Sequence, residues 1–436
     1  MTHHNRDRMF FPPVKGRKIE ARFNGGDITS NGGVMLLREI DRKLSLTKEA
    51  AKRIKDPRQP KKITHSILSM LRQRIYGIAL GYEDVNDHDS LRHDISIQSA
   101  LEIDEKGSSS PTLCRFEKYA NRKTIVGFHQ ILLDRFIASF KNPPKKLILD
   151  FDATDDPVHG NQEGKFFHGY YDHYCFLPLY VFCEKQLLVS YLRPSNQDAA
   201  KHSWAILSLL VKALRKQWPK VKIIFRADSG FCRHRIFNWC ERNNVDYITG
   251  IARNEVLEKH SLKTRARAAL LFQIKEENQR LFNEFQYAAR TWKRRRRILV
   301  KAEMNPLGPN TRYVVTSLKG DPQKLYDKLY CARGNMELSI GEQLSFYSDR
   351  TSCHQWWANQ FRLMLSSFAY VLIETLRRIY LKRTELKSAR CRTICEKLLK
   401  IGAVLIRNTR RIRFMLSTSY PYQRLFWNVY RKLCPG

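Results

Sequence analysis

Three carboxylates stand where they could bind metal ions. Asp152 lies near the end of an apolar run, Asp228 ends a second such run, and Glu337 lies far downstream in a helical pattern. Short apolar runs predict buried strands, and neighbouring strands lie about 5 Å apart. Two acids at that distance repel each other unless a divalent cation lies between them. The sequence therefore predicts that these residues hold two Mg²⁺ ions, which Mn²⁺ can replace, for phosphoryl transfer.

Each of these three positions has a second interpretation. Asp150 is an alternative first acid, since side chains alternate along a strand and Asp150 points to the same side as Asp152. The acids between residues 150 and 156 also fit a solvated turn. Asp228 fits a helix cap, and Glu337 fits an ordinary surface pair with the arginine four residues before it.

Tyr330 and Arg333 precede Glu337 at helical spacing. On a helix, Arg333 and Glu337 share a face, and Tyr330 lies two turns back on nearly the same line. The planar guanidinium of arginine can hold a phosphate oxygen with two parallel hydrogen bonds. We therefore predict that Arg333 holds a phosphate oxygen while Glu337 binds metal.

The elements that must position these acids follow a defined order. Apolar runs predict strands at residues 147–153, 177–183, 186–192, 222–227 and 245–251, with helices around residues 207–214 and at 231–243. Three strands, a helix, a strand, a helix and a strand is the order of the ribonuclease-H-like fold. The predicted class is α/β, with a mixed five-stranded sheet flanked by helices. A long helix is predicted at residues 356–381, and β-branched runs at 296–304 and 311–318 predict a β-rich insertion.

Boundary signals divide the chain into five predicted segments. Pro143 and Pro144 cannot continue a helix, so a boundary falls there. The segments are a helical DNA-binding domain (1–143), the first part of the ribonuclease-H-like core (144–252), the β-rich insertion domain (253–329), the helices that complete the core (330–390) and a basic helical C-terminal region (391–436). Within the first segment, residues 63–76 and a helix starting at Ser110-Pro111 fit either a helix-turn-helix-like unit or a packing domain without base contacts.

A large positive charge indicates a polyanionic partner. The 78 Lys and Arg residues against 42 Asp and Glu give a formal net charge of +36, for which nucleic acid is the expected partner. One basic run follows an aromatic residue and is predicted to bind DNA: Trp292, Lys293, Arg294, Arg295, Arg296 and Arg297. The tryptophan fits either a stacking site for an extruded base or a core residue beside a solvated face.

The remaining residue types add no further chemistry. None of the ten cysteines forms a Cys-x-x-Cys pair, which is typical of reduced thiols in a cytoplasmic protein. No apolar stretch reaches the roughly 20 residues that span a bilayer, so a membrane partner is not expected. His159, His168 and His173 with Asp172 could form a metal centre, but packing or phosphate contacts are the favoured interpretation.

The motifs together resemble those of DDE-type transposases of bacterial insertion sequences, and specifically the group typified by insertion sequence thirteen-eighty. The matching stretches are residues 150–160, 164–179, 192–196 and 226–231 and the segment with Tyr330, Arg333 and Glu337. The resemblance runs from about residue 20 to 380 and implies that Asp152, Asp228 and Glu337 are the catalytic acids. Tyr330, Arg333 and Glu337 also follow the Tyr-x2-Arg-x3-Glu signature of the wider hairpin-forming transposase class, which implies that Tyr330 and Arg333 contact DNA. One departure from this signature is Leu344, which stands where the class has a basic residue seven positions after the Glu.

This resemblance implies an enzyme that nicks DNA and transfers strands. Its partners would be double-stranded DNA, both the terminal inverted repeats and the target, and a second copy of the chain in the active complex. Cut-and-paste movement and a bacterial cytoplasmic location, on the nucleoid when DNA is bound, are further implications. The alternatives are a catalytically inactive DNA-binding protein derived from a transposase and a ribonuclease-H-like nuclease without strand transfer.

Overall fold

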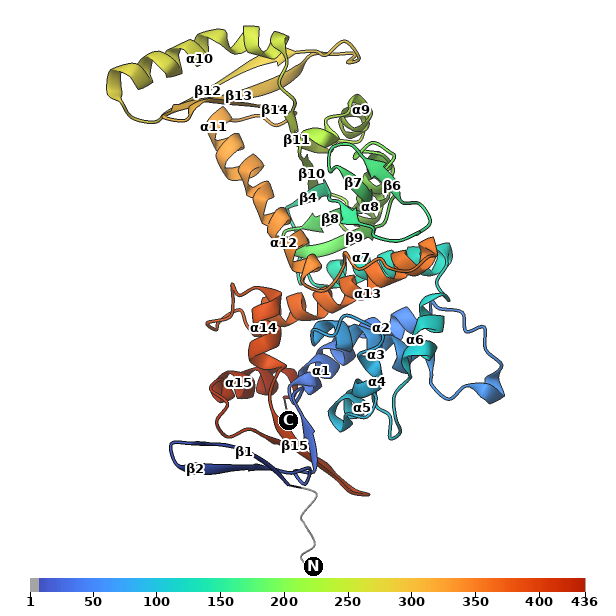
Figure 1. Ribbon diagram of the computed structural model, residues 1–436. Coiled ribbons are helices and arrows are strands. Elements are labelled where there is room, and N and C mark those ends of the chain that lie inside the picture. The colour runs from blue at the N-terminus through green and yellow to red at the C-terminus, as the bar shows by residue number, and fades with distance from the viewer. Residues whose placement is uncertain (1–7, 436) are drawn as a thin grey trace, which may run out of the picture. The chain divides into compact units, whose positions relative to one another are not determined.

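The computed structural model describes residues 8–435, which fold into two compact units (Figure 1). The central unit is Ala120–Ser367, and the terminal unit combines the segment up to Tyr119 with the segment from Phe368 onward. The boundary near residue 367 falls inside one helix, α13 (Trp356–Thr375), which continues as a π-helical turn to Tyr380. The predicted helix at residues 356–381 is therefore present.

Among the described residues, the largest sheet has eight strands and belongs to the central unit. Its order is β12-β13-β14-β11-β10-β4-β8-β9. The bounds are β4 Lys146–Ala153, β8 Leu179–Cys183, β9 Gln186–Tyr191, β10 Lys222–Ala227, β11 Asp246–Ile251, β12 Gln279–Tyr287, β13 Arg296–Asn305 and β14 Gly308–Thr316. Strands β4, β10 and β11 run parallel and their neighbours antiparallel, so the fold is α/β with a mixed sheet. The five-stranded sheet predicted from the sequence is wrong in size.

The extra strands come from the predicted insertion. Strand β14 pairs antiparallel with β11, with Ile248 opposite Thr316, so the insertion extends the edge of the main sheet. The insertion also contains a long helix, α10 (Glu255–Lys275), that the sequence did not predict. Only four of its residues are buried, Leu257, Ser261, Thr264 and Ala268, and two of them are polar, so the helix lacks a clear apolar stripe.

The two faces of the main sheet have different coverings. On one face, alternate residues of β4 and β10, including Leu149, Phe151 and Phe225, form a core with three helices. These helices are α7 (Arg122–Ala138), α8 (Ser203–Gln217) and α9 (His234–Arg242). On the other face, Ile224 and Ile248 pack with Tyr326. Because side chains alternate, Asp150 and Asp152 lie on this second face.

The segment that covers the second face is helical but irregular. It consists of α11 (Pro322–Lys324), a π-helical turn (Leu325–Tyr330), a 3-10 turn (Cys331–Arg333) and α12 (Gly334–Leu344). Changes of helical pitch of this kind are frequent at functional sites. This segment brings Arg333 and Glu337 to the face that carries the aspartates.

Smaller elements complete both units. In the central unit, β5 (Asp156–Pro157), β6 (Phe166–His168) and β7 (His173–Phe176) form a small sheet. The terminal unit contains a hairpin, β1 (Met9–Val14) and β2 (Arg17–Ala21), and a three-stranded sheet, β3 (Asp27–Thr29), β15 (Ala403–Arg407) and β16 (Ile412–Leu416). Its helices are α1 Val34–Leu44, α2 Leu46–Ala51, α3 Ile67–Ala79, α4 His88–Leu91, α5 Ile95–Leu101, α6 Ser110–Glu117, α14 Cys391–Leu398 and α15 Gln423–Leu433.

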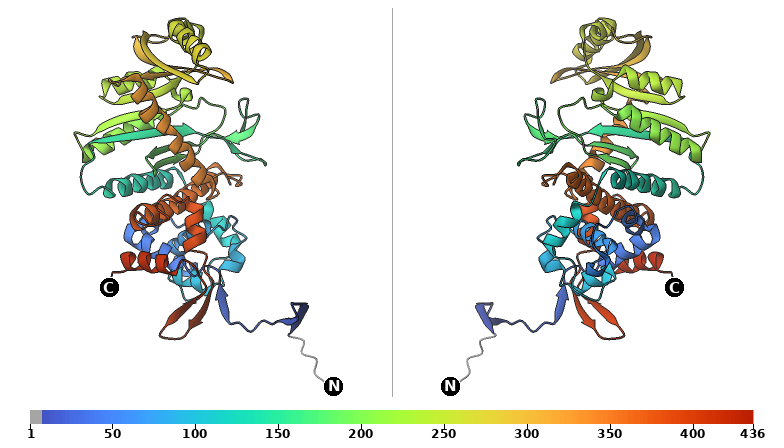
Figure 2. Two further views of the ribbon diagram at one scale, coloured as in Figure 1. Left: turned by 90° about the vertical axis from the view of Figure 1, so that its left-hand side faces the viewer. Right: turned by 90° about the vertical axis from the view of Figure 1, so that its right-hand side faces the viewer.

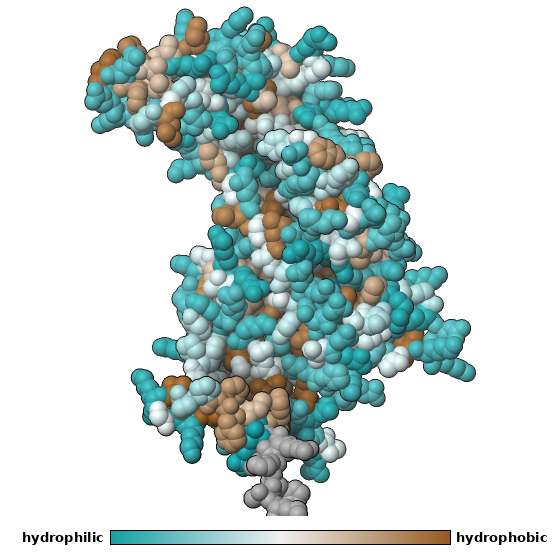
Figure 3. Space-filling model, viewed as in Figure 1, coloured by the Kyte–Doolittle hydropathy of each residue, from teal (hydrophilic) through white to brown (hydrophobic). Residues whose placement is uncertain are grey.

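The surface agrees with the composition. Hydrophilic residues dominate the face seen in Figure 3, as expected for a chain with 28% charged residues. Within residues 8–435, no helix is both long enough and apolar enough to cross a membrane.

Candidate active site

The ends of β4 and β10 bring Asp152 and Asp228 level with each other. In the parallel ladder, Asp150 lies opposite Arg226 and Phe151 opposite Ala227. The next residue on each strand is therefore Asp152 on one side and Asp228 on the other. Asp228 also accepts a hydrogen bond from the backbone N–H of Gly230 at 2.8 Å, so it caps the 3-10 turn that follows. The capping role and the position beside Asp152 are both present.

Arg333 joins the first aspartate to the downstream glutamate. Its Nη1 donates to Asp152 Oδ2 at 2.9 Å, and its Nη2 donates to Glu337 Oε1 at 2.5 Å. Asp152 is buried, whereas the Glu337 side chain is exposed. The pair expected on the helix is thus present, and the structure adds Asp152 as a third member.

The carboxylates influence one another electrostatically. Burial raises the pKa of Asp152 to about 7, while the guanidinium of Arg333 lowers it. The negative charges of Asp228 and Glu337 raise this pKa again. A cation bound beside these acids would favour the ionised form of Asp152.

The donor types in this cluster suit a divalent cation, although the present arrangement is not a metal cage. Carboxylate oxygens are the preferred ligands of Mg²⁺. In the described part of the chain, however, no group of three or more His, Cys, Asp or Glu side chains is arranged to hold a metal ion. Instead, Arg333 engages one oxygen of Asp152 and one of Glu337.

Asp150 has a different environment from Asp152. Both of its oxygens accept hydrogen bonds from Arg226, from Nε and, at 2.7 Å, from Nη2, and both side chains are buried. Arg226 also donates to the carbonyl of Leu329 at 2.5 Å. This buried pair ties the π-helical turn to the sheet, which is a positioning role.

The two aspartates are therefore expected to respond differently to substitution. Asp150→Ala should destabilise the central unit by about 3–5 kcal/mol, because Arg226 would remain buried without its partner. Asp152→Ala should cost less stability, because Arg333 would still have Glu337 as a partner. The same change should remove activity. Chemical denaturation and a DNA-cleavage assay on both variants measure this. If Asp150→Ala is as stable as the parent yet inactive, Asp150 is the first acid.

Tyr330 lies beside the carboxylates and depends on a glycine. A Cβ on Gly250 would lie 2.6 Å from the Tyr330 hydroxyl oxygen and 3.0 Å from the backbone nitrogen of Ser229. Strand β11 therefore needs glycine where the ring approaches the sheet. Burial raises the pKa of Tyr330. The charge of Arg333 lowers this pKa, and the charge of Asp228 raises it. Sequence reasoning missed Gly250, although a glycine inside a strand pattern is a signal of close approach.

Comparison with known proteins places the chain in a family. The family described as "Transposase DDE domain group 1" matches residues 11–435. The chain belongs to this transposase family. No curated protein matches the sequence. A solved structure, described as piggyBac transposase in a synaptic complex with hairpin DNA, is similar at 11% identity and a TM-score of 0.43, over 84% of this chain and 80% of that one.

The predicted stacking tryptophan of this transposase is packed rather than free. Trp292 contacts Phe237 and Tyr287 edge-on, with ring centres 5.7 and 5.6 Å apart. The guanidinium of Arg296 lies 5.0 Å from the centre of the Trp292 ring. Trp292 therefore lies against the core of the central unit.

The basic run after Trp292 divides into two groups. Arg296 is buried and binds Glu241, and Arg297 binds Glu284. Lys293, Arg294 and Arg295 are exposed, with Arg294 lying 3.3 Å from Glu241. The exposed group is the part of the run that can reach a ligand.

In the described residues, His159, His168 and His173 form no metal group with the acids around them. His173 Nε2 lies 3.0 Å from Asp155 Oδ2. Asp172 occupies the left-handed region, with φ of 58°. These residues shape a turn, in keeping with the favoured packing interpretation. At the departure from the signature, Leu344 is partly exposed at the end of α12.

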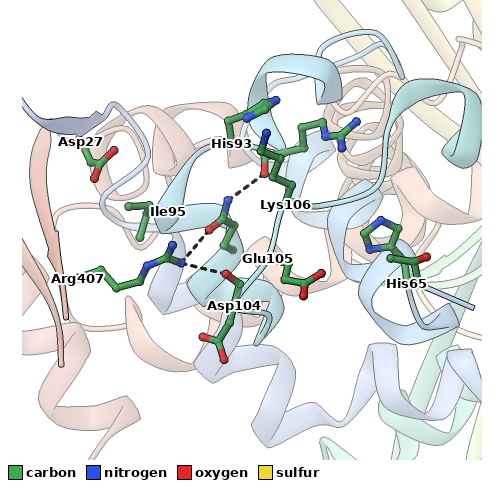
Figure 4. A pocket seen from close by; sticks show the side chains of 11 residues that line it. Asp27, His65, His93, Ile95, Asp104, Glu105, Lys106 and Arg407 are labelled. Atoms are coloured by element: carbon green, nitrogen blue, oxygen red, sulfur yellow. Dashed lines mark hydrogen bonds between the residues drawn. The ribbon is translucent and has the colours of Figure 1, made fainter. Parts of the chain in front are cut away.

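The terminal unit contains a separate polar hollow of about 610 Å³, shown in Figure 4. Arg407 points into it and donates to the side chain of Gln98 at 3.2 Å and to the carbonyl of Asp104 at 3.1 Å. Gln98 in turn donates to the carbonyl of Arg92 at 3.0 Å. These bonds anchor the end of β15 that leads into the turn of the β15–β16 ribbon, where Arg407 lies opposite Ile412.

Proposed function

We propose that the protein is a DNA transposase that binds the terminal inverted repeats of an insertion sequence of the thirteen-eighty group and cleaves and transfers DNA strands with divalent metal. The family membership supports the general activity. The observation that carries the specific site is the placement of Asp152 and Asp228 at adjacent strand ends, with Glu337 linked to Asp152 through Arg333.

The proposed core is ribonuclease-H-like. The five strands expected from the sequence lie next to one another within the eight-stranded sheet, in the order β9-β8-β4-β10-β11, which supports such a core. The first acid lies on the central strand β4 and the second follows its neighbour β10. The insertion then separates both from the helix that carries Glu337. This arrangement supports the assignment of the three acids in the roles of a DDE site.

In the proposed mechanism, Asp152, Asp228 and Glu337 hold two Mg²⁺ or Mn²⁺ ions. Such ions, when bound, activate a water or a 3′-hydroxyl and stabilise the leaving oxygen, without a covalent protein intermediate. Arg333 is then free to hold a non-bridging phosphate oxygen of the scissile strand. Tyr330, whose hydroxyl lies against Gly250, is the second proposed contact to this strand.

DNA binding is proposed for exposed basic surfaces of both units. Lys293, Arg294 and Arg295 provide one in the central unit. In the terminal unit, the β15–β16 ribbon (403–417) carries four arginines and no acid. Its turn is held by Asn408, whose side chain accepts from the backbone N–H groups of Arg410 and Arg411 at 3.1 and 2.9 Å. A two-stranded ribbon fits the major groove of DNA.

Replacing the three outer arginines of this ribbon tests that surface. The triple variant Arg410→Gln, Arg411→Gln and Arg413→Gln should weaken binding to a random-sequence duplex. In a plot of the logarithm of affinity against the logarithm of salt concentration, the slope should become shallower by about 2–3. Each lost phosphate contact lowers the magnitude of that slope by about 0.9. The matched control replaces Lys259, Lys263 and Arg267, which are exposed on α10. Equal changes in both variants would show only a general effect of charge.

The activity itself is tested with DNA that carries the inverted repeats flanking the gene. Incubation with Mg²⁺ should give nicks at the element ends and joined products, and active complexes should contain two copies of the chain. Nicks without joined products would favour a nuclease. Shifted but uncut DNA would favour an inactive DNA-binding protein.

A further inference from the structure

One hairpin of the central unit exposes several aromatic rings. Residues 165–174 form β6, a tight turn and the start of β7, and the hairpin stands out from the unit in Figure 2. Its exposed aromatic side chains are Phe166, Phe167, Tyr170 and Tyr174, with Tyr170 85% exposed. Soluble proteins rarely leave such groups uncovered unless the patch binds something.

The hairpin is firmly built. Phe167 pairs with Tyr174 across the two strands, and their rings meet edge-on with centres 5.7 Å apart. The turn is closed by the backbone N–H of Asp172, which donates to the carbonyl of His168 at 2.8 Å. At the base, Ser195 Oγ donates to the carbonyl of Phe166 at 2.8 Å. The rings are therefore presented by ordered backbone.

The hairpin also adjoins the carboxylate cluster. Strand β7 leads directly into β8, where Leu179 lies opposite Ala153, the residue after Asp152. The backbone N–H of Thr154 donates to the carbonyl of Pro178 at 3.3 Å. At the turn, half-buried Tyr171 has a pKa raised to about 12, first by burial and then by the charges of Asp155 and Asp152. Strand β7, which carries the exposed Tyr174, thus runs toward the end of β4 where the proposed catalytic site lies.

We propose that this aromatic hairpin binds unpaired nucleobases at the DNA end held by the carboxylates, with bases stacking on Tyr170, Phe167 and Tyr174. Every base has a π-face, so aromatic platforms bind single strands with little sequence preference. Lys165 lies 5.2 Å from the centre of the Tyr174 ring, which places a cation for the backbone phosphate beside a stacking surface. This proposal rests on the proposed function, because it assumes that a DNA end reaches the carboxylates.

The occupant is a nucleobase rather than a second copy of the chain for two reasons. The hairpin pairs through β7 with β5, which follows the strand of Asp152 after two residues, and the carboxylates and arginine at that strand end suit phosphodiester chemistry. The other candidate for base stacking, Trp292, is covered by Phe237 and Tyr287, whereas the hairpin rings are open.

The experiment measures binding to two DNA probes in an Asp228→Asn background, so that cleavage does not interfere. One probe is a fully paired duplex, and the other has a short single-stranded end that contains 2-aminopurine. Binding should quench the fluorescence of the second probe. Tyr170→Ala with Phe167→Ala should weaken binding to the frayed probe about 5- to 100-fold, the range for lost base stacks, and leave the paired probe unchanged. Tyr170→Trp should restore binding, and Trp204→Ala, an exposed aromatic on α8, should have no effect.

Three results for the alanine variant would overturn the proposal. The first is unchanged affinity for the frayed probe, and the second is an equal loss of affinity for both probes. The third is a change of the variant from two copies to one with no loss of frayed-end binding. The last would identify the patch as a contact between copies. Quenching that depends on Tyr170 in a protein whose wild type cleaves no DNA would support the hairpin and count against the proposed chemistry. The two proposals can therefore fail separately.

Discussion

Asp228→Asn is expected to lower the rate of DNA cleavage by about a thousandfold or more while leaving DNA affinity unchanged. The change removes one of the negative charges proposed to hold the metal ions, which contribute several kcal/mol to transition-state stabilisation. The fold should survive, because the amide oxygen of asparagine can still accept the hydrogen bond from Gly230 that caps the 3-10 turn. Loss of activity would then report chemistry and not unfolding.

The measurement compares cleavage of a labelled duplex with its equilibrium binding by the same protein. Asp134→Asn is the matched control, since Asp134 is an exposed acid on α7 and the change in charge is identical. Parallel loss of binding and cleavage in Asp228→Asn would mean that Asp228 holds the structure and not the metal. Full cleavage would remove Asp228 from the site.

The elements around the site could be predicted because their signals are local. Strand β10 begins and ends at the predicted residues, and β4 and β11 each begin one residue from theirs, since apolar runs between polar residues mark buried strands. The end of β10 therefore put Asp228 in the correct loop. The period of two likewise placed Asp150 and Asp152 on one face of β4.

The sequence could not predict which strands pair with one another or in which register. The partnership of Asp150 with Arg226 exists only because β4 and β10 align in one register, and shifting a strand by one residue would turn its side chains to the other face. The same limit applies to β14, whose apolar run predicted a strand but not that it would join β11. Separate sheets and an extended sheet have the same local pattern.

The roles of exposed and buried aromatic residues were equally hidden. Trp292 beside a basic run fitted a stacking site in sequence, yet its ring packs on Phe237. The sequence suggested no stacking role for Phe167, Tyr170 and Tyr174, which face solvent. Composition does not distinguish them, because burial depends on long-range packing. The helix α10 was missed for the related reason that few of its residues are buried.

Arg333→Gln is expected to tighten the binding of Mn²⁺ to the free protein by about tenfold or more and yet to abolish cleavage. Arg333 neutralises Asp152 and Glu337 in the absence of DNA, with bonds of 2.9 and 2.5 Å, and thereby competes with any cation for their oxygens. Two unit charges a few ångströms apart interact by roughly 1 kcal/mol in bulk water and roughly 4 kcal/mol near a protein surface. This range includes the free energy that corresponds to a tenfold change in affinity. Removing the guanidinium leaves the three carboxylates uncompensated.

Cleavage should nevertheless fall by about a thousandfold, since an arginine that holds a transferring phosphoryl group contributes on that order. Isothermal titration with Mn²⁺ in the absence of DNA measures the first effect, and cleavage of the labelled duplex measures the second. Arg333→Lys is the informative control: it keeps the charge but cannot bridge two carboxylates with a planar fork, so its affinity for Mn²⁺ should lie between those of the parent and Arg333→Gln. Weaker binding of Mn²⁺ by Arg333→Gln would show that Arg333 assembles the acidic cluster instead of occupying it.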